Sequence, residues 1–112
     1  MKLSIYQVRI GQDTLNLAFR DLATVLKNSD NGRVPPEYYD RVYTGEVEAE
    51  TLEDVFAIFN LDHPLGYRGR SLSQSDVVEV YRKDVSEFYF CDTCAFVPIE
   101  FDKDNCMEGD GR

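Results

Sequence analysis

Three short runs of aromatic and β-branched residues lie close together in the C-terminal half of the chain, at residues 76–81, 88–91 and 96–99. Short polar turns at 82–84 and 92–93 separate them. Strand-forming runs joined by short turns predict antiparallel hairpins. Pro98 has no N–H to donate, so we expect its strand at an edge or a bulge. This pattern constrains the chain to a fold built around an antiparallel sheet.

The N-terminal half adds two strands and a helix. Residues 3–10 carry apolar side chains on both faces and precede Gly11, which predicts a central strand. Residues 38–44 are aromatic and β-branched and predict a second strand. Between them, helical spacing predicts a helix over about 19–27 from the apolar residues Phe19, Leu22, Ala23 and Leu26. Its start stays open, because either Asn16 caps it or residues 17–19 are extended.

A second helix is predicted over residues 52–59. It carries an apolar stripe made of Leu52, Val55, Phe56 and Phe59. Thr51 and Asp54 have the spacing of a capping box, and Pro64 and Gly66 terminate the helix. The predicted fold class is therefore α+β, with two helices packed on a mixed, largely antiparallel sheet of about five strands.

Length and charge limit the function classes. With 112 residues we expect a single domain over 1–101, a surface loop over 28–36 and a flexible acidic tail over 102–112. The net charge of −9 argues against direct nucleic-acid binding and against binding to anionic membranes. No apolar run spans a membrane and no signal-peptide core begins the chain. The three cysteines, an odd number, suit a reducing compartment. We expect a cytoplasmic monomer without membrane contact.

The chain has one histidine and three cysteines, and their spacing completes no catalytic or metal-binding set. Cys91 and Cys94 have a metal-like or redox-like spacing, but His63 and Cys106 are the only further zinc ligands and do not complete a pair. We expect both thiols to be packing residues, with no metal and no cofactor. The single histidine, His63, follows a predicted helix and is expected to bond its last carbonyls. The sequence has no nucleophile elbow and no phosphate-binding glycine loop, so we expect no enzyme activity.

The segment 66–76 is the candidate binding loop. It combines two arginines with hydroxyls and glycines, which together are suited to holding a phosphate or carboxylate. The candidate binding residues are Tyr67, Arg68, Arg70, Ser71, Ser73, Ser75 and Asp76. The alternative is a structural loop, in which Ser73 and Ser75 close turns.

A row of five carboxylates without an intervening cation precedes and enters the second helix: Glu46, Glu48, Glu50, Glu53 and Asp54. Such a row is typical of a solvated helix start, where negative charge favours the helix N-terminus. The alternative is a surface that imitates a phosphate backbone.

Several of these segments carry a family resemblance. The second predicted helix and its end read Thr51-Leu52-Glu53-Asp54-Val55-Phe56-Ala57-Ile58-Phe59-Asn60-Leu61-Asp62-His63-Pro64. A second string follows them, Gly69-Arg70-Ser71-Leu72-Ser73-Gln74-Ser75-Asp76-Val77-Val78. Together they resemble the signature of the YodL-like domain, an amphipathic helix with an Asn-hydrophobe-Asp/Asn-His/Arg-Pro turn and then Gly-His-Ser-Leu-Ser-x-Ser-Asp-Val-Val. Ile5-Tyr6-Gln7, the segment from Tyr39 to Thr44, and Phe90-Cys91-Asp92-Thr93-Cys94-Ala95-Phe96 resemble further parts of it. The resemblance covers about residues 3–101.

The resemblance has two departures. Arg70 replaces the family's usual His, so no histidine chemistry transfers to this loop, and Cys94-Ala95 replaces an aromatic-Gly pair. The resemblance implies a bacterial protein, often encoded on conjugative or other mobile elements beside antirestriction-type domains, and implies no activity. We therefore expect a non-catalytic module that binds a protein partner. The alternatives are an acidic DNA mimic of the antirestriction type and an anion-binding enzyme domain.

Overall fold

A computed structural model describes the protein apart from residues 30, 62, 68, 94 and 109–112. The strands are β1 (Lys2–Val8), β2 (Tyr39–Glu46), β3 (Val77–Arg82), β4 (Val85–Cys91), β5 (Phe96–Ile99) and β6 (Met107–Glu108). The helices are α1 (Leu22–Asn28) and α2 (Leu52–Leu61), and three 3₁₀ turns are η1 (Gln12–Thr14), η2 (Pro36–Tyr38) and η3 (Lys103–Asn105).

The strands form a sheet in the order β5-β4-β3-β1-β2-β6. All pairs from β5 to β2 are antiparallel, whereas β6 pairs parallel with β2 over Asp40 and Arg41. This confirms the predicted α+β class and both hairpins, with β6 as a short sixth strand. The predicted central position of the first strand is also confirmed, since β1 lies between β2 and β3 and buries six of its seven residues. Pro98 lies in β5 at the edge of the sheet, as its missing N–H requires.

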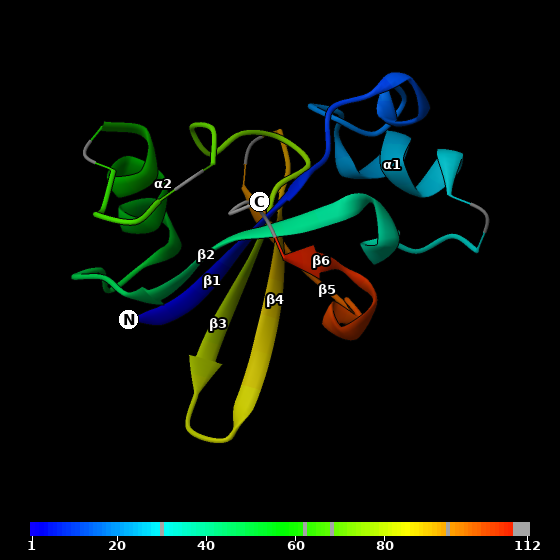
Figure 1. The fold of residues 1–112 in the computed structure, drawn as a ribbon. Helices are drawn as coiled ribbons and strands as arrows, with labels where there is room; N and C mark the ends of the chain where they lie inside the picture. The colour runs from blue at the N-terminus through cyan, green and yellow to red at the C-terminus, as the bar shows by residue number, and fades with distance from the viewer. Residues whose placement is uncertain (30, 62, 68, 94, 109–112) are drawn as a thin grey trace.

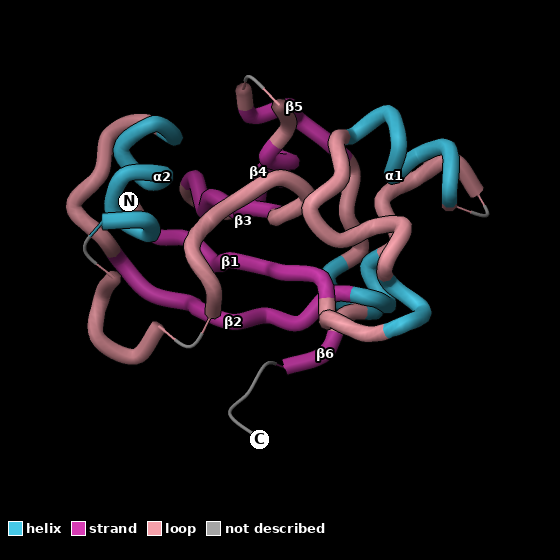
Figure 2. Tube along the Cα trace, turned by 90° about the horizontal axis from the view of Figure 1, so that it is seen from above, coloured by secondary structure: helices cyan, strands magenta, loops and turns pink. Residues whose placement is uncertain are grey.

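Two apolar clusters hold the helices against the sheet. Because side chains alternate along a strand, β1 supplies both clusters. Leu3 and Ile5 pack in the cluster that contains Phe59 of α2, whereas Tyr6 and Val8 pack in the cluster that contains Val25 of α1. The two helices lie at opposite ends of the twisted sheet (Figure 1). The loop that follows α2 crosses the space between them (Figure 2).

The first helix begins later than the sequence predicts. It starts at Leu22, because the Asp21 side chain caps it by accepting from the Thr24 N–H at 3.1 Å. Phe19, which fits the helical spacing, instead adopts φ +64° in the turn before the helix, a value that a right-handed helix excludes. Asn16 therefore does not cap the helix, and residues 17–19 form turns, not a strand.

The second helix agrees with its predicted start. The Asp54 N–H donates to the Thr51 hydroxyl at 3.1 Å, and the Thr51 N–H donates to the Asp54 carboxylate at 3.2 Å, which confirms the capping box. Val55 and Phe59 are buried, but Phe56, expected in the same stripe, is 41% exposed. Among the described residues, no helix is both long and apolar enough to cross a membrane.

The segment after residue 101 is also part of the structure. From the sequence we expect a flexible tail over 102–112, but residues 102–108 form η3 and β6, and residues 109–112 lie outside the described part. The reason is a long-range ion pair, in which the Lys103 ammonium donates to the buried Glu79 carboxylate at 2.8 Å. The expected loop over 28–36 is likewise anchored, since Val34 is buried in the α1 cluster.

Candidate functional site

The candidate binding loop is attached to the sheet by Gln7, a buried polar residue of β1. The Gln7 amide oxygen accepts from the Arg70 N–H at 2.9 Å, and its amide nitrogen donates to the Arg70 carbonyl at 3.0 Å. The same nitrogen lies 3.1 Å from the Tyr67 hydroxyl and 3.0 Å from the Asp76 carboxylate. The Tyr67 hydroxyl also donates to the Arg70 carbonyl. One glutamine side chain therefore fixes three of the candidate site residues.

Ser75 joins this loop to the segment that precedes α1. It is fully buried at φ +80°, and its hydroxyl accepts from the N–H of Phe19, which is itself at φ +64°. The Ser75 carbonyl accepts from the Tyr39 hydroxyl at 2.5 Å, and its N–H donates to the Cys91 carbonyl at 3.1 Å. Positive φ is costly for residues other than glycine, so these bonds hold two unfavourable conformations in place.

Arg70 lies at the surface end of the same network. One guanidinium nitrogen donates to the Val8 carbonyl at 3.1 Å, and the guanidinium carbon lies 5.1 Å from the centre of the Phe19 ring. A guanidinium over an aromatic ring at this distance is a cation–π contact. The second predicted arginine, Arg68, lies outside the described residues.

Asp76 lies beneath the loop without any exposed surface. One carboxylate oxygen accepts from the Gln7 amide and, at 2.8 Å, from the Ser73 N–H. Burial raises the Asp76 pKa to about 7, although the bonds from Ser73 and Gln7 and the charge of Arg70 oppose the rise. Three buried polar atoms of this loop have no hydrogen-bond partner among the described residues: Arg70 Nε, Ser73 Oγ and the second Asp76 oxygen.

The structure thus brings together most of the predicted site residues, in two layers. Tyr67, Ser75 and Asp76 face protein groups and fasten the loop, whereas Ser71 is exposed and Arg70 and Ser73 are half-buried. His63 is exposed, and its ring lies 5.0 Å from that of Tyr67. Five concavities among the described residues are lined by residues outside this loop.

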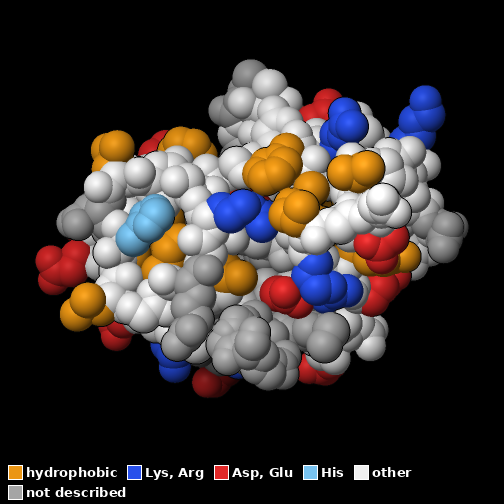
Figure 3. All heavy atoms as spheres, turned by 45° about the horizontal axis from the view of Figure 1, so that its top comes forward, with side chains coloured by type: hydrophobic (Ala, Val, Ile, Leu, Met, Phe, Trp, Pro, Cys, Tyr) orange, Lys and Arg blue, Asp and Glu red, His pale blue; other side chains and the backbone are white. Residues whose placement is uncertain are grey.

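The segment that carries Phe19, which Arg70 covers, exposes apolar side chains that sequence reasoning missed. Ile10, Leu15 and Phe19 are 59%, 64% and 49% exposed, and all three project from residues 9–20. That segment is held compact by hydrogen bonds from the Gly11, Leu17 and Arg20 N–H groups within it. Hydrophobic side chains gather beside basic ones in the middle of this side of the molecule (Figure 3). We call Ile10, Leu15, Phe19, Arg20 and Arg70 the Phe19–Arg70 face.

Gln7 is the second residue that sequence reasoning missed as part of the site. The available signal was a polar side chain within a strand that is otherwise apolar on both faces. Such a residue, once buried, needs hydrogen-bond partners from elsewhere in the fold. Phe19 carried no comparable signal, because its spacing matched the helix that follows.

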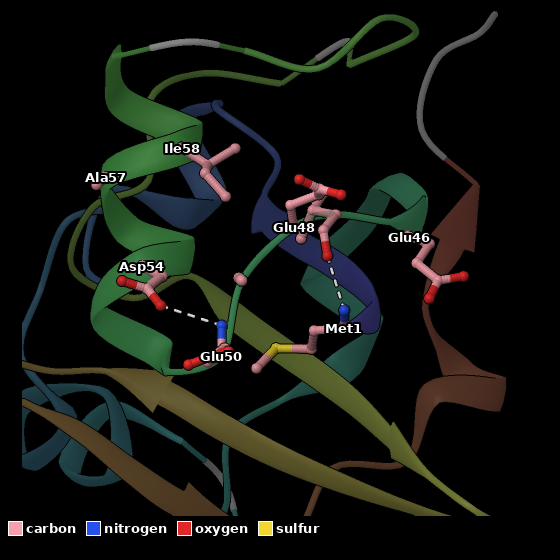
Figure 4. Close-up of a pocket in the computed structure, with 9 residues that line it drawn as sticks. Met1, Glu46, Glu48, Glu50, Asp54, Ala57 and Ile58 are labelled. Carbon is pink, nitrogen blue, oxygen red and sulfur yellow. Dashed lines mark hydrogen bonds between the residues drawn. The ribbon is translucent and has the colours of Figure 1, made fainter.

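The acidic row lies on another part of the molecule, around an open groove of about 940 Å³ between α2 and the segment after β2. Glu46, Glu48, Glu50 and Asp54 line it (Figure 4). Asp54 is already used by the helix start, because its carboxylate accepts from the Glu50 and Thr51 N–H groups, which lower its pKa.

Of the predicted cysteine pair, the structure describes Cys91. Cys91 is buried at the end of β4, and burial first, then the charges of Asp76 and Asp92, raise its pKa to about 12. A thiol with so high a pKa is a poor nucleophile. Cys94 lies outside the described residues, and the described part of the chain holds no cluster of three metal-ligating side chains.

Residues 2–101 match the family model of the YodL-like domain. The matched range coincides closely with the span of the resemblance seen in the sequence and ends before the segment that carries Lys103. No curated protein and no solved structure matches the chain.

Proposed function

The chain belongs to the YodL-like domain family, and on that basis we propose that it is a non-catalytic module that binds a protein partner through the Phe19–Arg70 face. The observation that carries the proposal is Phe19. A large aromatic residue is half exposed, is held at φ +64°, and is covered by a guanidinium. Unfavourable backbone conformations persist where surrounding bonds enforce them, and they concentrate at functional positions.

The composition of the face supports a protein partner. Exposed aromatic and arginine side chains are enriched at the centres of protein interfaces. Arg20 and Arg70 make no ion pair with a described carboxylate, whereas Arg9, Arg33 and Arg82 each do. Two such cations beside apolar side chains, on a chain of net charge −9, favour a partner segment with apolar and acidic side chains.

The interior of the loop argues against an anion-binding enzyme. Asp76 has no exposed surface, and the hydroxyl and carbonyl of Ser75 already bond to Phe19 and Tyr39, so neither residue is free to contact a phosphate or carboxylate in the loop. We further propose that this module acts as a monomer in the bacterial cytoplasm, among the proteins of a mobile element. These points follow the family's setting.

Phe19→Gly is the variant that tests the face. Glycine adopts positive φ without strain, so this change removes the ring and keeps the backbone. We expect the melting temperature to stay within a few degrees of the wild type and partner binding to fall at least tenfold, since central aromatic residues carry much of an interface's free energy. Val85→Ser, which changes another exposed apolar residue, is the matched control.

The partner is obtained by photo-crosslinking from position 15. A photoreactive residue in place of Leu15 should give a crosslinked species in a bacterial lysate that the same residue at position 85 does not give. Excess wild-type domain should compete for it, and the Phe19→Gly domain should not. Equal crosslinking from both positions, or equal competition by both domains, would show that the face is not the contact surface.

A second candidate function is the acidic DNA mimic, which the grouping of Glu46, Glu48 and Glu50 around one groove favours. It predicts competition with duplex DNA for a type I restriction enzyme, weakening steeply as salt rises. Replacing these three glutamates by glutamine should abolish the competition, while Phe19→Gly should leave it unchanged. Competition that survives the triple replacement would exclude the mimic.

A further inference from the structure

Asp76 links the buried end of the loop to the Phe19–Arg70 face. Its carboxylate holds the Ser73 N–H and the Gln7 amide, and Gln7 in turn holds the Arg70 backbone. The neighbouring Ser75 holds the Phe19 N–H. Arg70 is therefore two hydrogen bonds from this carboxylate, and Phe19 is one hydrogen bond from the residue that precedes Asp76.

This carboxylate is poorly solvated by the protein. One oxygen accepts both bonds, and the other, although fully buried, has no partner among the described residues. An ionised carboxylate in this position is costly, whereas the protonated form removes the buried charge. The site therefore favours the neutral acid.

The groups around Asp76 do not supply a compensating charge beyond Arg70. Gln7 faces it from β1, Tyr67 and Arg70 from the loop, Tyr39 from β2, and Cys91 from β4. Burial raises the pKa of Tyr39, Tyr67 and Cys91, so these three are neutral near pH 7. Arg70 attracts the carboxylate, but its guanidinium is directed to Val8 and Phe19.

We propose that protonation of Asp76 fastens residues 69–76 of the loop to the sheet and so controls how rigidly Phe19 and Arg70 are presented to a partner. The link to a partner rests on the proposed function above, whereas the fastening itself is a property of the isolated chain. Acidification below neutrality closes the loop, and ionisation at higher pH allows it to open.

The direction follows from proton linkage. In the closed loop the Asp76 pKa is about 7, and in an opened loop exposed to water it returns towards 3.8. Between these two values the closed form holds a proton that the open form releases, so rising pH favours opening by about tenfold per pH unit. Above pH 7 both forms are ionised and the opening constant becomes level. We expect opening to be on the order of 10- to 100-fold more frequent at pH 8 than at pH 5.

Hydrogen exchange on the partner-free domain tests this. The Phe19, Arg70 and Ser73 amides should lose protection on the order of 10- to 100-fold between pH 5 and pH 8, after correction for intrinsic exchange. Asp76→Asn, a neutral mimic of the protonated acid, should keep the pH 5 protection throughout. Asp84→Asn, which neutralises an exposed carboxylate in the β3–β4 turn, should keep the wild-type profile.

A second measurement needs no variant. The carboxyl carbon signal of Asp76 in the wild-type domain should titrate near pH 7, together with the Arg70 amide. A midpoint near 4, exchange independent of pH, or an Asp76→Asn domain with the wild-type profile would overturn the proposal. Neither measurement involves a partner. Hydrogen exchange that does not depend on pH would overturn this proposal without affecting the crosslinking result, and a failure to crosslink a partner would overturn the proposed function without affecting the pH dependence of exchange.

Discussion

Asp76 and Glu79 lie three residues apart at the start of β3, and neither exposes any surface, yet the fold treats their carboxylates in opposite ways. Glu79 accepts from four donors, which are the hydroxyls of Tyr6, Tyr81 and Ser86 and the ammonium of Lys103. Asp76 accepts from two donors on one oxygen.

The pKa directions reflect this difference. Burial raises the pKa of both acids, but at Glu79 the bonds from Lys103, Ser86 and Tyr6 lower it by more, so the net pKa lies below its ordinary value. At Asp76 burial dominates. A buried acid is therefore stable in its charged form only when hydrogen-bond donors satisfy both carboxylate oxygens. We call Glu79 and its four donors the Glu79 cluster and interpret it as a structural anchor. We call Asp76 with its donors Gln7 and Ser73 the Asp76 cluster and interpret it as the one whose stability changes with pH.

The largest effect is expected at the anchor. Glu79→Ala leaves a half-buried ammonium and three hydroxyls without their acceptor, which should lower the free energy of unfolding by about 3–5 kcal/mol. Urea denaturation measures the loss. Glu87→Ala is the control, because it breaks an ion pair with Arg82 in which both side chains are largely exposed, and it should cost far less. Equal losses in the two variants would remove the anchor interpretation.

The second prediction separates the two acids by pH. The pKa of folded Asp76 is raised from 3.8 to about 7, so its stabilising contribution is complete below 3.8 and is lost as pH rises through 7. The pKa of folded Glu79 is lowered from 4.5, so its contribution is present above 4.5 and is lost as pH falls through the lowered value. Asp76→Asn should therefore raise the free energy of unfolding at pH 8 by about 2–4 kcal/mol and change it little near pH 3.5.

Denaturation curves of the wild type, Asp76→Asn and Glu79→Gln between pH 3 and pH 8 check these signs. Glu79→Gln should be most destabilised near neutral pH and approach the wild type in acid. A gain for Asp76→Asn that is the same at both ends of the range would mean that the Asp76 charge is not its cause.

A third prediction concerns how closely the loop fits over Gln7, independently of charge. A Cβ at Gly69 would lie 2.5 Å from the Gln7 amide oxygen and 2.7 Å from the Tyr67 hydroxyl. Gly69→Ala should therefore displace the loop and cost about 1–3 kcal/mol in the free energy of unfolding. At Gly11 the nearest atom is an Asp13 carboxylate oxygen at 3.1 Å, so Gly11→Ala should cost less. Comparable costs would mean that the loop is not closely fitted.

The sequence predicted the parts of this fold that depend on neighbouring residues. The Thr51–Asp54 capping box and the β3–β4 hairpin join residues close in the chain, and both are confirmed. The first helix was predicted over about 19–27 with its start left open, because the apolar spacing extends to Phe19. The Asp21 cap sets that start at Leu22. Residues 102–112 were predicted to be a flexible tail because they are polar and carry glycines. The pairing of Lys103 with Glu79 joins residues 24 positions apart, so no local pattern indicated it.

The sequence predicted which residues form the candidate loop, but not the contacts that hold the loop in place. The loop 66–76 could be recognised from its arginines, hydroxyls and glycines. Gln7 and Tyr39 hold this loop, and each is more than thirty positions from the loop residue that it bonds, Asp76 and Ser75 respectively. Local patterns do not indicate such pairings. The exposed ring of Phe19 depends on a left-handed conformation imposed by Ser75, which no propensity predicts.

The smallest effect is expected at Cys91, which borders the Asp76 cluster without belonging to its hydrogen-bonded side chains. Its backbone joins the cluster, since its N–H donates to the Asp76 carbonyl at 2.8 Å, and its side chain contributes burial alone. Cys91→Ala should therefore cost about 1 kcal/mol, the value of one small buried side chain. Because backbone contacts survive the change, the pH dependence set by Asp76 should stay that of the wild type.

The wild type should also melt at the same temperature with and without EDTA, and protein purified without added metal should hold less than about a tenth of an equivalent of zinc. Stoichiometric zinc, or a melting temperature lowered by EDTA, would mean that Cys91 is a metal ligand, and the Asp76 cluster would then have a charged neighbour that alters its pKa.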